Sequence, residues 1–391
     1  MNSLQVIAPA NVTELSECAN ITPLAPFSSE ILSFIAALSH HLLNDREVKP
    51  HPELVALGFW LRDSTMQKFA NEQSKALRKA LGVVVHFTPA NVDTMFIYSW
   101  VCSLLMGNNN IVRLASAETA AKNSLINALN VLFARQQFSE IAKRNVFVSY
   151  PRESSLSAEL SLLADARVIW GGDASVTAIR SLAIKPRCRD VSFADRYSAA
   201  LINGDALHNA EQINKLAQLL WRDTKPYAQQ ACSSPRVIFW LGDTRQQTAL
   251  FAQLNQLADQ QNSEVQTLNN HLVVSQLIQS SGLASQALLL EHICALPVAQ
   301  IKAEFLEWHL GNSLYLIKYI EQLDELAALI DTKLQTLSYW QVDKSALLKL
   351  VAQPSIQGVD RIVPVGQALD FSPVWDGFDL FTLLSRSILC L

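Results

Sequence analysis

Short apolar runs that alternate with helical segments are the feature that most restricts the fold of this chain. From residue 82 onward, the runs GVVVHF, NIVRL, VFVSY, RVIWGG and YSAALI are separated by segments with helical spacing of apolar residues. Such alternation is typical of βαβ units, in which helices cover both faces of a parallel sheet. The length of 391 residues, 50% of them hydrophobic, is enough for about two to three domains with cores of their own. We therefore predict an α/β fold with a parallel sheet.

The pattern along the chain predicts three parts. Residues 1–202 form a cofactor-binding domain, in which a helical segment over about residues 30–80 precedes Rossmann-like βα units. Residues 203–350 form a second α/β domain, with a helix over NAEQINKLAQLLWRDT, the strand VIFW and a long Gln- and Leu-rich helical stretch to about residue 310. Residues 351–391 are rich in Gly, Pro and Asp before their end, and we expect them to return over the active-site cleft.

Charge and cysteine spacing exclude several classes of function. The formal net charge is -4 with both signs interspersed, so no nucleic-acid partner is indicated. The longest uncharged apolar run, TMFIYSWVCSLLM, has 13 residues and is too short to span a bilayer. The start, MNSLQVIAPANVTELSEC, lacks Lys and Arg and does not match a secretory signal. The six cysteines are never closer than 44 positions, which excludes CxxC motifs and a disulfide scaffold, so we expect a cytoplasmic protein.

Cys232 stands in a turn of small polar residues, QQACSSP, directly before the apolar run VIFW. A cysteine is a nucleophile only as thiolate, and an unperturbed thiol with a pKa near about 8.5 is mostly protonated at neutral pH. A partly exposed turn with backbone donors suits a thiolate, whereas most cysteines are small core hydrophobes. The other five fit the second description; Cys102, for example, lies in an apolar helical run. Cys232 is therefore the candidate nucleophile.

Three predicted turns follow strands at their carboxyl ends, where open parallel sheets bind ligands. They are residues 88–91, 113–116 and 170–173. The Asn91 amide can donate a hydrogen bond to an oxyanion, Arg113 can hold a phosphate, and Gly171 and Gly172 let the backbone approach a ligand. Each residue also has an ordinary interpretation, as a turn residue or a helix cap.

Fingerprints of several other chemistries are absent from the sequence. It contains no GxGxxG, GxxxxGK[ST] or GxSxG motif, so neither phosphate fingerprint nor a serine hydrolase elbow is present. His271, His292 and His309 share no metal-ligand spacing, and His86 lies inside a predicted strand. We therefore predict no metal site and no serine mechanism.

Five motifs in order, TPAN, NIVRLAS, WGGDASV, RDVSFADRYSAALI and QQACSSPRVIF, resemble the aldehyde dehydrogenase superfamily. Within it the chain is most similar to the fatty acyl-CoA reductases of bacterial luminescence, the LuxC type. The resemblance covers residues 50–240 and resumes in RIVPVGQALDFSPVWDGFDLFTLLSR. Residues 1–45 and most of 245–340 have no comparable match, and the chain is shorter than typical members. The resemblance implies an aldehyde dehydrogenase-like fold with a Rossmann-like cofactor domain and a second α/β catalytic domain.

The resemblance also implies roles for the motif residues. Cys232 would accept the acyl group, and Asn91 with the backbone N–H of Cys232 would form an oxyanion hole. Arg113 stands where the superfamily has a lysine facing the ribose and phosphate of the cofactor. Ser116 stands where NAD-using members often have a glutamate, which leaves room for a 2′-phosphate and implies NADPH. The loop that passes the pyrophosphate and nicotinamide corresponds to Trp170, Gly171, Gly172 and Asp173.

One departure from the superfamily bears on the reaction. Aldehyde dehydrogenases activate water with a glutamate, and ungapped alignment puts Ser192 at that place, where a serine is no equivalent base. The resemblance therefore implies NADPH-dependent reduction of a fatty acyl-CoA or acyl-carrier thioester to aldehyde through an acyl-Cys232 intermediate. Two alternatives stay open: an NAD(P)-dependent dehydrogenase that oxidises aldehyde to acid, and a catalytically silent acyl-accepting subunit. Relatives of this type also imply a homo-oligomer and partner subunits, an acyl-protein synthetase and an acyl-transferase.

Overall fold

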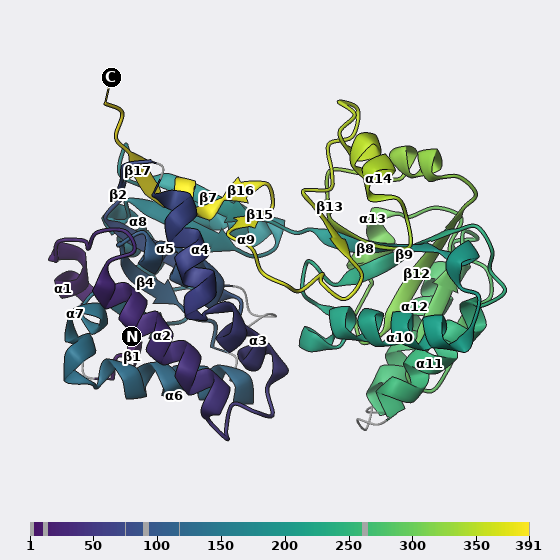
Figure 1. Cartoon of the computed structure of the whole chain (residues 1–391), viewed down its shortest axis with the longest axis horizontal. Helices are drawn as coiled ribbons and strands as arrows, with labels where there is room; N and C mark the ends of the chain where they lie inside the picture. The colour runs from purple at the N-terminus through teal and green to yellow at the C-terminus, as the bar shows by residue number, and fades with distance from the viewer. Residues whose placement is uncertain are drawn as a thin grey trace. The chain divides into compact units, whose positions relative to one another are not determined.

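In the computed structural model the chain divides into two compact units (Figure 1). Unit 1 comprises residues 1–194 and 371–391, and unit 2 comprises residues 195–370. The structure describes residues 4–10, 15–74, 76–88, 94–116, 118–259 and 265–390. The first boundary lies before the strand YSAALI, not after it at residue 202, because this strand pairs within the sheet of unit 2. The segment 351–391 is divided between the two units.

A mixed sheet forms the centre of unit 1. Five of its described strands are parallel, and β1 pairs antiparallel with β5 at one edge. The order is β1 (Gln5–Ala8), β5 (Asn145–Ser149), β4 (Asn109–Arg113), β3 (Val83–Phe87), β6 (Ala166–Trp170), β7 (Arg189–Phe193). The predicted strands GVVVHF, NIVRL, VFVSY and RVIWGG are β3 to β6, so the parallel βαβ arrangement is confirmed. The sequence pattern did not indicate β7, an edge strand that begins with the charged pair Arg189 and Asp190.

Helices cover both faces of this sheet. On one face α2, α5 and α6 enclose an aromatic cluster that includes Phe34, Trp100 and Phe147. On the other face α1, α8 and α9 cover a core around Val83 and Val85. The α-helices of unit 1 are α1 (Leu15–Asn20), α2 (Ser29–Asn44), α3 (Pro52–Trp60), α4 (Asp63–Gln73), α5 (Phe96–Leu105), α6 (Ala120–Phe133), α7 (Ser139–Ala142), α8 (Leu156–Leu163), α9 (Asp173–Arg180) and α15 (Leu380–Leu383).

The last residues of the chain return to unit 1. A short hairpin joins β15 (Val374–Trp375) to β16 (Phe378–Asp379), and β17 (Ser385–Ser387) pairs with β2 (Arg78–Ala80). A buried ion pair ties the edge of the main sheet, since the fully buried Arg167 of β6 makes two contacts of 2.7 Å with the Asp190 carboxylate of β7. These contacts fix the start of β7 beside the start of β6.

Unit 2 contains a second sheet, parallel apart from the short edge strand β10. Its order is β10 (Leu288–Leu289), β11 (Cys294–Pro297), β12 (Leu314–Ile320), β9 (Pro235–Leu241), β8 (Tyr197–Asn203), β13 (Leu334–Trp340), β14 (Arg361–Pro364). The predicted strand VIFW lies in β9, and the predicted helix NAEQINKLAQLLWRDT is α10 (Ala210–Thr224).

Two helical layers enclose the sheet of unit 2. The first contains α10 and α11 (Gln247–Asp259), and the second contains α12 (Val265–Ser280), α13 (Ala303–Glu307) and α14 (Lys344–Val351). The prediction of a helical stretch to about residue 310 is wrong beyond Ser280, where β10 and β11 follow. These strands have two and four residues, too few to show a strand period in the sequence.

Candidate active site

Cys232 lies in unit 2, on the turn that enters β9. It is half-buried, and its turn is closed by a 3.0 Å hydrogen bond from the Ser234 N–H to the Ala231 carbonyl oxygen. The entry of β9 lies between the entries of β8 and β12, because all three strands are parallel neighbours. The prediction that this cysteine occupies a partly exposed turn before a strand is therefore confirmed.

The backbone before Cys232 adopts a strained conformation that the neighbouring chain holds in place. Three consecutive residues have positive φ: Tyr227 (56°), Ala228 (49°) and Gln229 (65°). Such residues cost about 1–3 kcal/mol each and persist only where the surroundings fix them. The Asn312 N–H donates to the Ala228 carbonyl oxygen at 2.8 Å, and the buried Gln229 amide donates to the Pro235 and Leu314 carbonyl oxygens at 2.8 and 2.9 Å. The Cys232 turn is thus anchored to the entry of β12.

Gln335 and Ser198, both in the described part of the chain, form hydrogen bonds to Cys232. The Gln335 amide nitrogen, at the start of β13, donates to the Cys232 sulfur at 3.5 Å, and Gln335 is itself buried. The Ser198 hydroxyl of β8 donates to the Cys232 carbonyl oxygen at 2.6 Å and accepts the Thr336 N–H at 3.1 Å. Donors aimed at sulfur favour thiolate over thiol, and the serine fixes where the sulfur stands. Sequence reasoning missed Gln335, which lies 103 residues from Cys232.

Two arginines bring positive charge to this turn: Arg236 of β9 and Arg361 at the start of β14. Burial lowers the pKa of both guanidinium groups, and nearby negative charges, that of the Cys232 thiolate included, act in the opposite direction. The attraction is mutual, so both charges favour the thiolate. Arg236 could have been predicted from the sequence, because it is only four residues from Cys232. No sequence signal connects Arg361 with Cys232.

A buried histidine next to this turn is neutral. Burial lowers the pKa of His309 to about 3. Its Nδ1 accepts the Gly311 N–H at 3.1 Å, which leaves Nε2 to donate to the Leu314 carbonyl oxygen at 2.8 Å. His309 therefore supports the loop that anchors the Cys232 turn, rather than supplying a base.

Asp223, near the end of α10, connects the Cys232 turn to the segment that follows β14. Its fully buried carboxylate accepts the Gly366 and Ala368 N–H groups at 2.6 and 2.9 Å. Its carbonyl oxygen accepts the Ser234 hydroxyl at 2.8 Å. One residue therefore positions two segments on which the site depends.

This carboxylate predicts a pH dependence of stability. Burial raises the pKa of Asp223 from 3.8 to about 7, despite two backbone donors that lower it. Since the folded state holds the proton more tightly, this stabilisation is present below about pH 4 and is lost as the pH rises through about 7. We expect the free energy of unfolding of the wild type to fall between about pH 5 and pH 8 by on the order of 2 kcal/mol more than that of Asp223→Asn. This magnitude follows from about 1.4 kcal/mol per unit of pKa shift. Urea unfolding at both pH values checks this, and parallel pH profiles of the two proteins would contradict it.

The buried cysteines have environments that suppress thiolate formation. Burial raises the pKa of Cys18 and of Cys294 to about 12, and it also raises the pKa of Cys102. Cys188 is half-buried and its pKa is raised by the same cause. These thiols are therefore poor nucleophiles in the folded chain.

Arg113 ends β4 in unit 1, next to the end of β3. Its guanidinium carbon lies 5.4 Å from the centre of the Tyr150 ring, and no described residue forms an ion pair with it. The Thr88 hydroxyl donates to the Arg113 carbonyl oxygen at 2.9 Å, which fixes the strand end. Ser116 is exposed in the loop that follows. A cation that pairs with no described carboxylate, at the carboxyl end of a parallel strand, suits an anionic ligand.

The segment 170–173 ends β6 on the other side of β3. The chain runs from β3 toward β4 and β5, then returns to β6 and β7 on the opposite side, which makes the ends of β3 and β6 a topological switch point. Trp170 is mostly buried: its ring stacks on Phe193 at 3.8 Å, and its N–H donates to the Ser99 hydroxyl at 3.3 Å. A Cβ on Gly172 would meet no heavy atom within 4 Å, and α9 begins with the exposed Asp173 directly after it.

These features fit a dinucleotide. Open space at Gly172 next to the N–H groups at the start of α9 suits a pyrophosphate, and the charge of Arg113 suits a further phosphate. Two strand spacings of about 4.8 Å separate the backbones of β4 and β6, so the two strand ends are close enough for one extended ligand to reach both. At Gly171 and Gly172 a ligand can approach the backbone closely. The Trp170 side chain, in contrast, packs against Phe193 and bonds Ser99 inside the protein.

Asn91 lies outside the described residues, so its predicted amide contact stays a prediction. Ser192 lies on β7, and no described residue forms a hydrogen bond with its buried hydroxyl. Among described residues Asp259, Glu291 and His292 place possible metal-ligand atoms within 4.8 Å of one another, and an ordinary 3.3 Å contact between His292 and Asp259 accounts for part of this. No helix in the described ranges is long and apolar enough to span a bilayer.

Comparison with known proteins places this geometry in context. The model of the acyl-CoA reductase (LuxC) family matches residues 59–387. A long-chain acyl-protein thioester reductase 2 from Photobacterium leiognathi is 25% identical over 171 residues, 44% of this chain and 34% of that protein. A long-chain acyl-protein thioester reductase from Aliivibrio fischeri is 24% identical over 165 residues, 41% of this chain and 32% of that protein. The matched part thus spans about a third of the length of these relatives.

Solved structures establish the fold. An NADP dependent enzyme from E. coli superposes with a TM-score of 0.68 at 10% identity, covering 98% of this chain and 88% of that one. The Staphylococcus aureus AldH superposes with a TM-score of 0.64 at 13% identity, covering 92% and 88%. The predicted aldehyde dehydrogenase-like fold is therefore confirmed, and so is the resemblance noted from the motifs.

Proposed function

Because the chain belongs to the acyl-CoA reductase (LuxC) family, we propose that it reduces an activated fatty acyl group to an aldehyde through a thioester on Cys232. The substrate is a thioester of coenzyme A or of an acyl carrier. The observation that carries this proposal is the Cys232 turn: a half-buried sulfur at the entry of a parallel strand, with a donor from Gln335 and two arginine charges nearby. The names of the two relatives, acyl-protein thioester reductases, point to the same substrate class.

NADPH is the cofactor that we propose, held by residues of unit 1. Arg113 and the exposed Ser116 would receive the 2′-phosphate, and the backbone of residues 170–173, with the start of α9, would receive the pyrophosphate. Bound NADPH would supply the hydride that reduces the acyl carbon.

The residues of the chain itself account for the remaining steps. The Cys232 thiolate attacks the acyl carbon, a carbon–sulfur bond to Cys232 forms, and the carrier leaves as its thiol after taking a proton. The Asn91 amide and the Cys232 N–H donate to the oxyanion in both tetrahedral states. After reduction, the bond between the carbon and the Cys232 sulfur breaks, which releases the aldehyde and restores the thiolate. Ser192 supplies no base for water, so hydrolysis does not compete.

The proposal is tested with purified protein, tetradecanoyl-CoA and NADPH. The expected result is one tetradecanal formed for each NADPH oxidised. Oxidation of tetradecanal to the acid with NAD, without the reductive reaction, would instead identify an aldehyde dehydrogenase. A protein-bound acyl label that hydroxylamine releases and NADPH does not would identify a silent acyl-accepting subunit. Either result overturns the proposal.

Arg113 predicts the choice of cofactor. In Arg113→Ala we expect the KM for NADPH to rise about tenfold or more, because a charge-assisted hydrogen bond contributes about 1.5–3 kcal/mol. The KM for NADH should change little, because NADH lacks the 2′-phosphate. Steady-state kinetics with both cofactors measure this, and Arg187→Ala, which removes an exposed arginine of the same unit, is the matched control. An equal rise of the KM for NADPH and for NADH would show that Arg113 does not recognise the 2′-phosphate.

The family also suggests partners. We propose that an acyl-protein synthetase supplies the activated acyl group and that an acyl-transferase supplies its fatty acid, in a complex with a homo-oligomer of this chain. Co-purification of the tagged chain with these two enzymes tests the assembly.

A further inference from the structure

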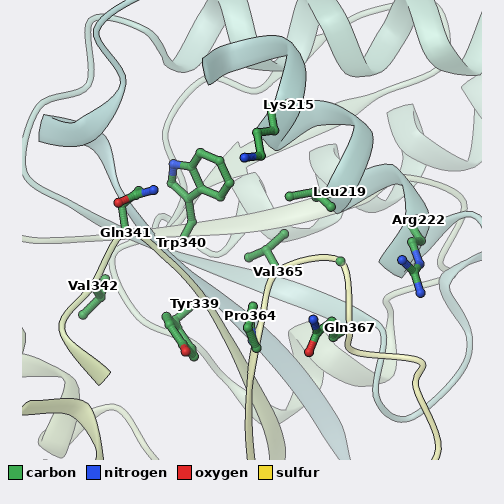
Figure 2. Close-up of a pocket in the computed structure, with 11 residues that line it drawn as sticks. Lys215, Leu219, Arg222, Tyr339, Trp340, Gln341, Val342, Pro364, Val365 and Gln367 are labelled. Carbon is green, nitrogen blue, oxygen red and sulfur yellow. The ribbon is translucent and has the colours of Figure 1, made fainter. Parts of the chain in front are cut away.

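A pocket lies in unit 2, away from the Cys232 sulfur. It has a volume of about 410 Å³ and is bounded by α10, the carboxyl end of β13 and the end of β14 (Figure 2). Cys232 contacts the start of β13 through Gln335, and Trp340 lies five residues further along this strand. At about 3.4 Å per residue, these two positions are about 17 Å apart. The volume falls in the range of ligand pockets, about 300–1,000 Å³.

The topology of the sheet favours a ligand at this place. The chain leaves β8 toward β9 on one side, and β13 leads to β14 on the other. The connecting helices α10 and α14 lie on opposite faces. The carboxyl ends of β8 and β13 therefore form a topological switch point, where open parallel sheets bind ligands, and the pocket lies next to it, at the ends of β13 and β14.

The lining offers donors and positive charge on an apolar floor. Lys215 is exposed, and no described residue makes a hydrogen bond or an ion pair with its ammonium. Trp340 is only 7% exposed, and its buried indole N–H has no acceptor among the residues that the structure describes. In Figure 2 these two side chains lie on the same side of the pocket, and Arg222, paired with Asp370 at 3.0 Å, lies on the other. Leu219, Pro364 and Val365 form an apolar floor between them, and Val342 lies at the edge of the pocket (Figure 2).

The wall of the pocket is fixed rather than a loose loop. Gly366 has a φ of +95°, which favours glycine, and a Cβ there would collide with the Leu219 side chain of α10. Its N–H is bound by the buried Asp223 carboxylate at 2.6 Å. The pocket therefore has a shape determined by α10 and by the segment after β14.

We propose that this pocket binds a small amphiphilic anion, with a carboxylate or phosphate head at Lys215 and an apolar portion over Leu219 and Val365. The ammonium of Lys215 supplies the opposite charge. A neutral amphiphile could pack on the apolar floor but would form no ion pair with Lys215.

The experiment is isothermal titration calorimetry of the purified full chain with four probes below their micelle concentrations: dodecanoate, dodecyl phosphate, dodecanol and inorganic phosphate. We expect at least one of the two anionic amphiphiles to bind. Dodecanol and inorganic phosphate should bind at least about tenfold more weakly; dodecanol does so because it cannot form the charge-assisted hydrogen bond. The comparison of dodecanoate with dodecyl phosphate identifies the preferred head. Equal binding of dodecanol and of both anions would overturn the proposal.

Two controls distinguish this pocket from the proposed acyl site. Lys215→Gln should weaken the anionic probe about tenfold or more, whereas Lys349→Gln, which removes an exposed lysine on α14, should not. Protein alkylated at Cys232 should bind the probe as before. Binding that alkylation abolishes and that Lys215→Gln leaves unchanged would assign the probe to the acyl site, which overturns this inference and leaves the proposed reductase activity intact.

Discussion

Replacing Cys232 with alanine is expected to abolish both the labelling of the protein by radioactive tetradecanoyl-CoA and the NADPH-dependent formation of aldehyde. The variant has no sulfur to form the acyl bond, and removing a catalytic nucleophile costs on the order of 10⁶ in rate. Labelling is measured on denatured, gel-separated protein, and treatment with hydroxylamine confirms that the wild-type label is a thioester. The remaining structure should be unaffected, since the Cys232 side chain is only half-buried.

The matched control for this variant is Cys188→Ala, which removes another half-buried cysteine, from unit 1. Burial raises the pKa of the Cys188 thiol, so it should contribute nothing to labelling. Full labelling of Cys188→Ala together with none in Cys232→Ala identifies the nucleophile. A hydroxylamine-sensitive label that persists in Cys232→Ala would refute its role.

Replacing Asn91 with alanine is expected to lower kcat about 10²- to 10³-fold, because one side-chain donor to an oxyanion contributes about 2.7–4 kcal/mol to the barrier. In the sequence Asn91 comes after β3, and it lies outside the described residues. Single-turnover measurements with tetradecanoyl-CoA separate the acylation rate from the reduction rate, and both should fall, since both pass through a tetrahedral oxyanion.

Alkylation of Cys232 by iodoacetamide distinguishes this role from a structural one. The reaction has no oxyanion, so its rate in Asn91→Ala should equal that of the wild type. A fall in alkylation that matches the fall in turnover would show that the substitution disturbs the Cys232 turn, and the oxyanion role would be rejected.

Local patterns determined much of the architecture. The strands β3 to β6 follow from short apolar runs separated by helical segments, because a parallel strand buried on both faces must be apolar along its length. The turn at Cys232 follows from small polar residues before the apolar strand β9, and the structure places the sulfur there, half-buried. Gly172 before α9 likewise matches the open backbone expected there.

For other elements the sequence contains no local signal. The strands β10 and β11 are too short to interrupt the apparent helical stretch, and β7 is an edge strand that begins with two charged residues. The strand β8 looks like a continuation of the first set of βα units, yet it belongs to unit 2 because it pairs with β9 and β13. Whether a strand joins one sheet or another depends on partners far away in the chain.

By itself, the sequence determined the class of fold, the polar turn that carries Cys232 and the strand ends where ligands are expected, since each depends on residues within a few positions of one another. Only the tertiary structure decided that Gln335, Arg361 and Asp223 converge on the Cys232 turn. Gln335 reaches the sulfur because β13 enters the sheet beside β8 instead of beside β12, its predecessor in the chain. Strand order is set by the packing of whole helical layers, and no short stretch of residues contains that information.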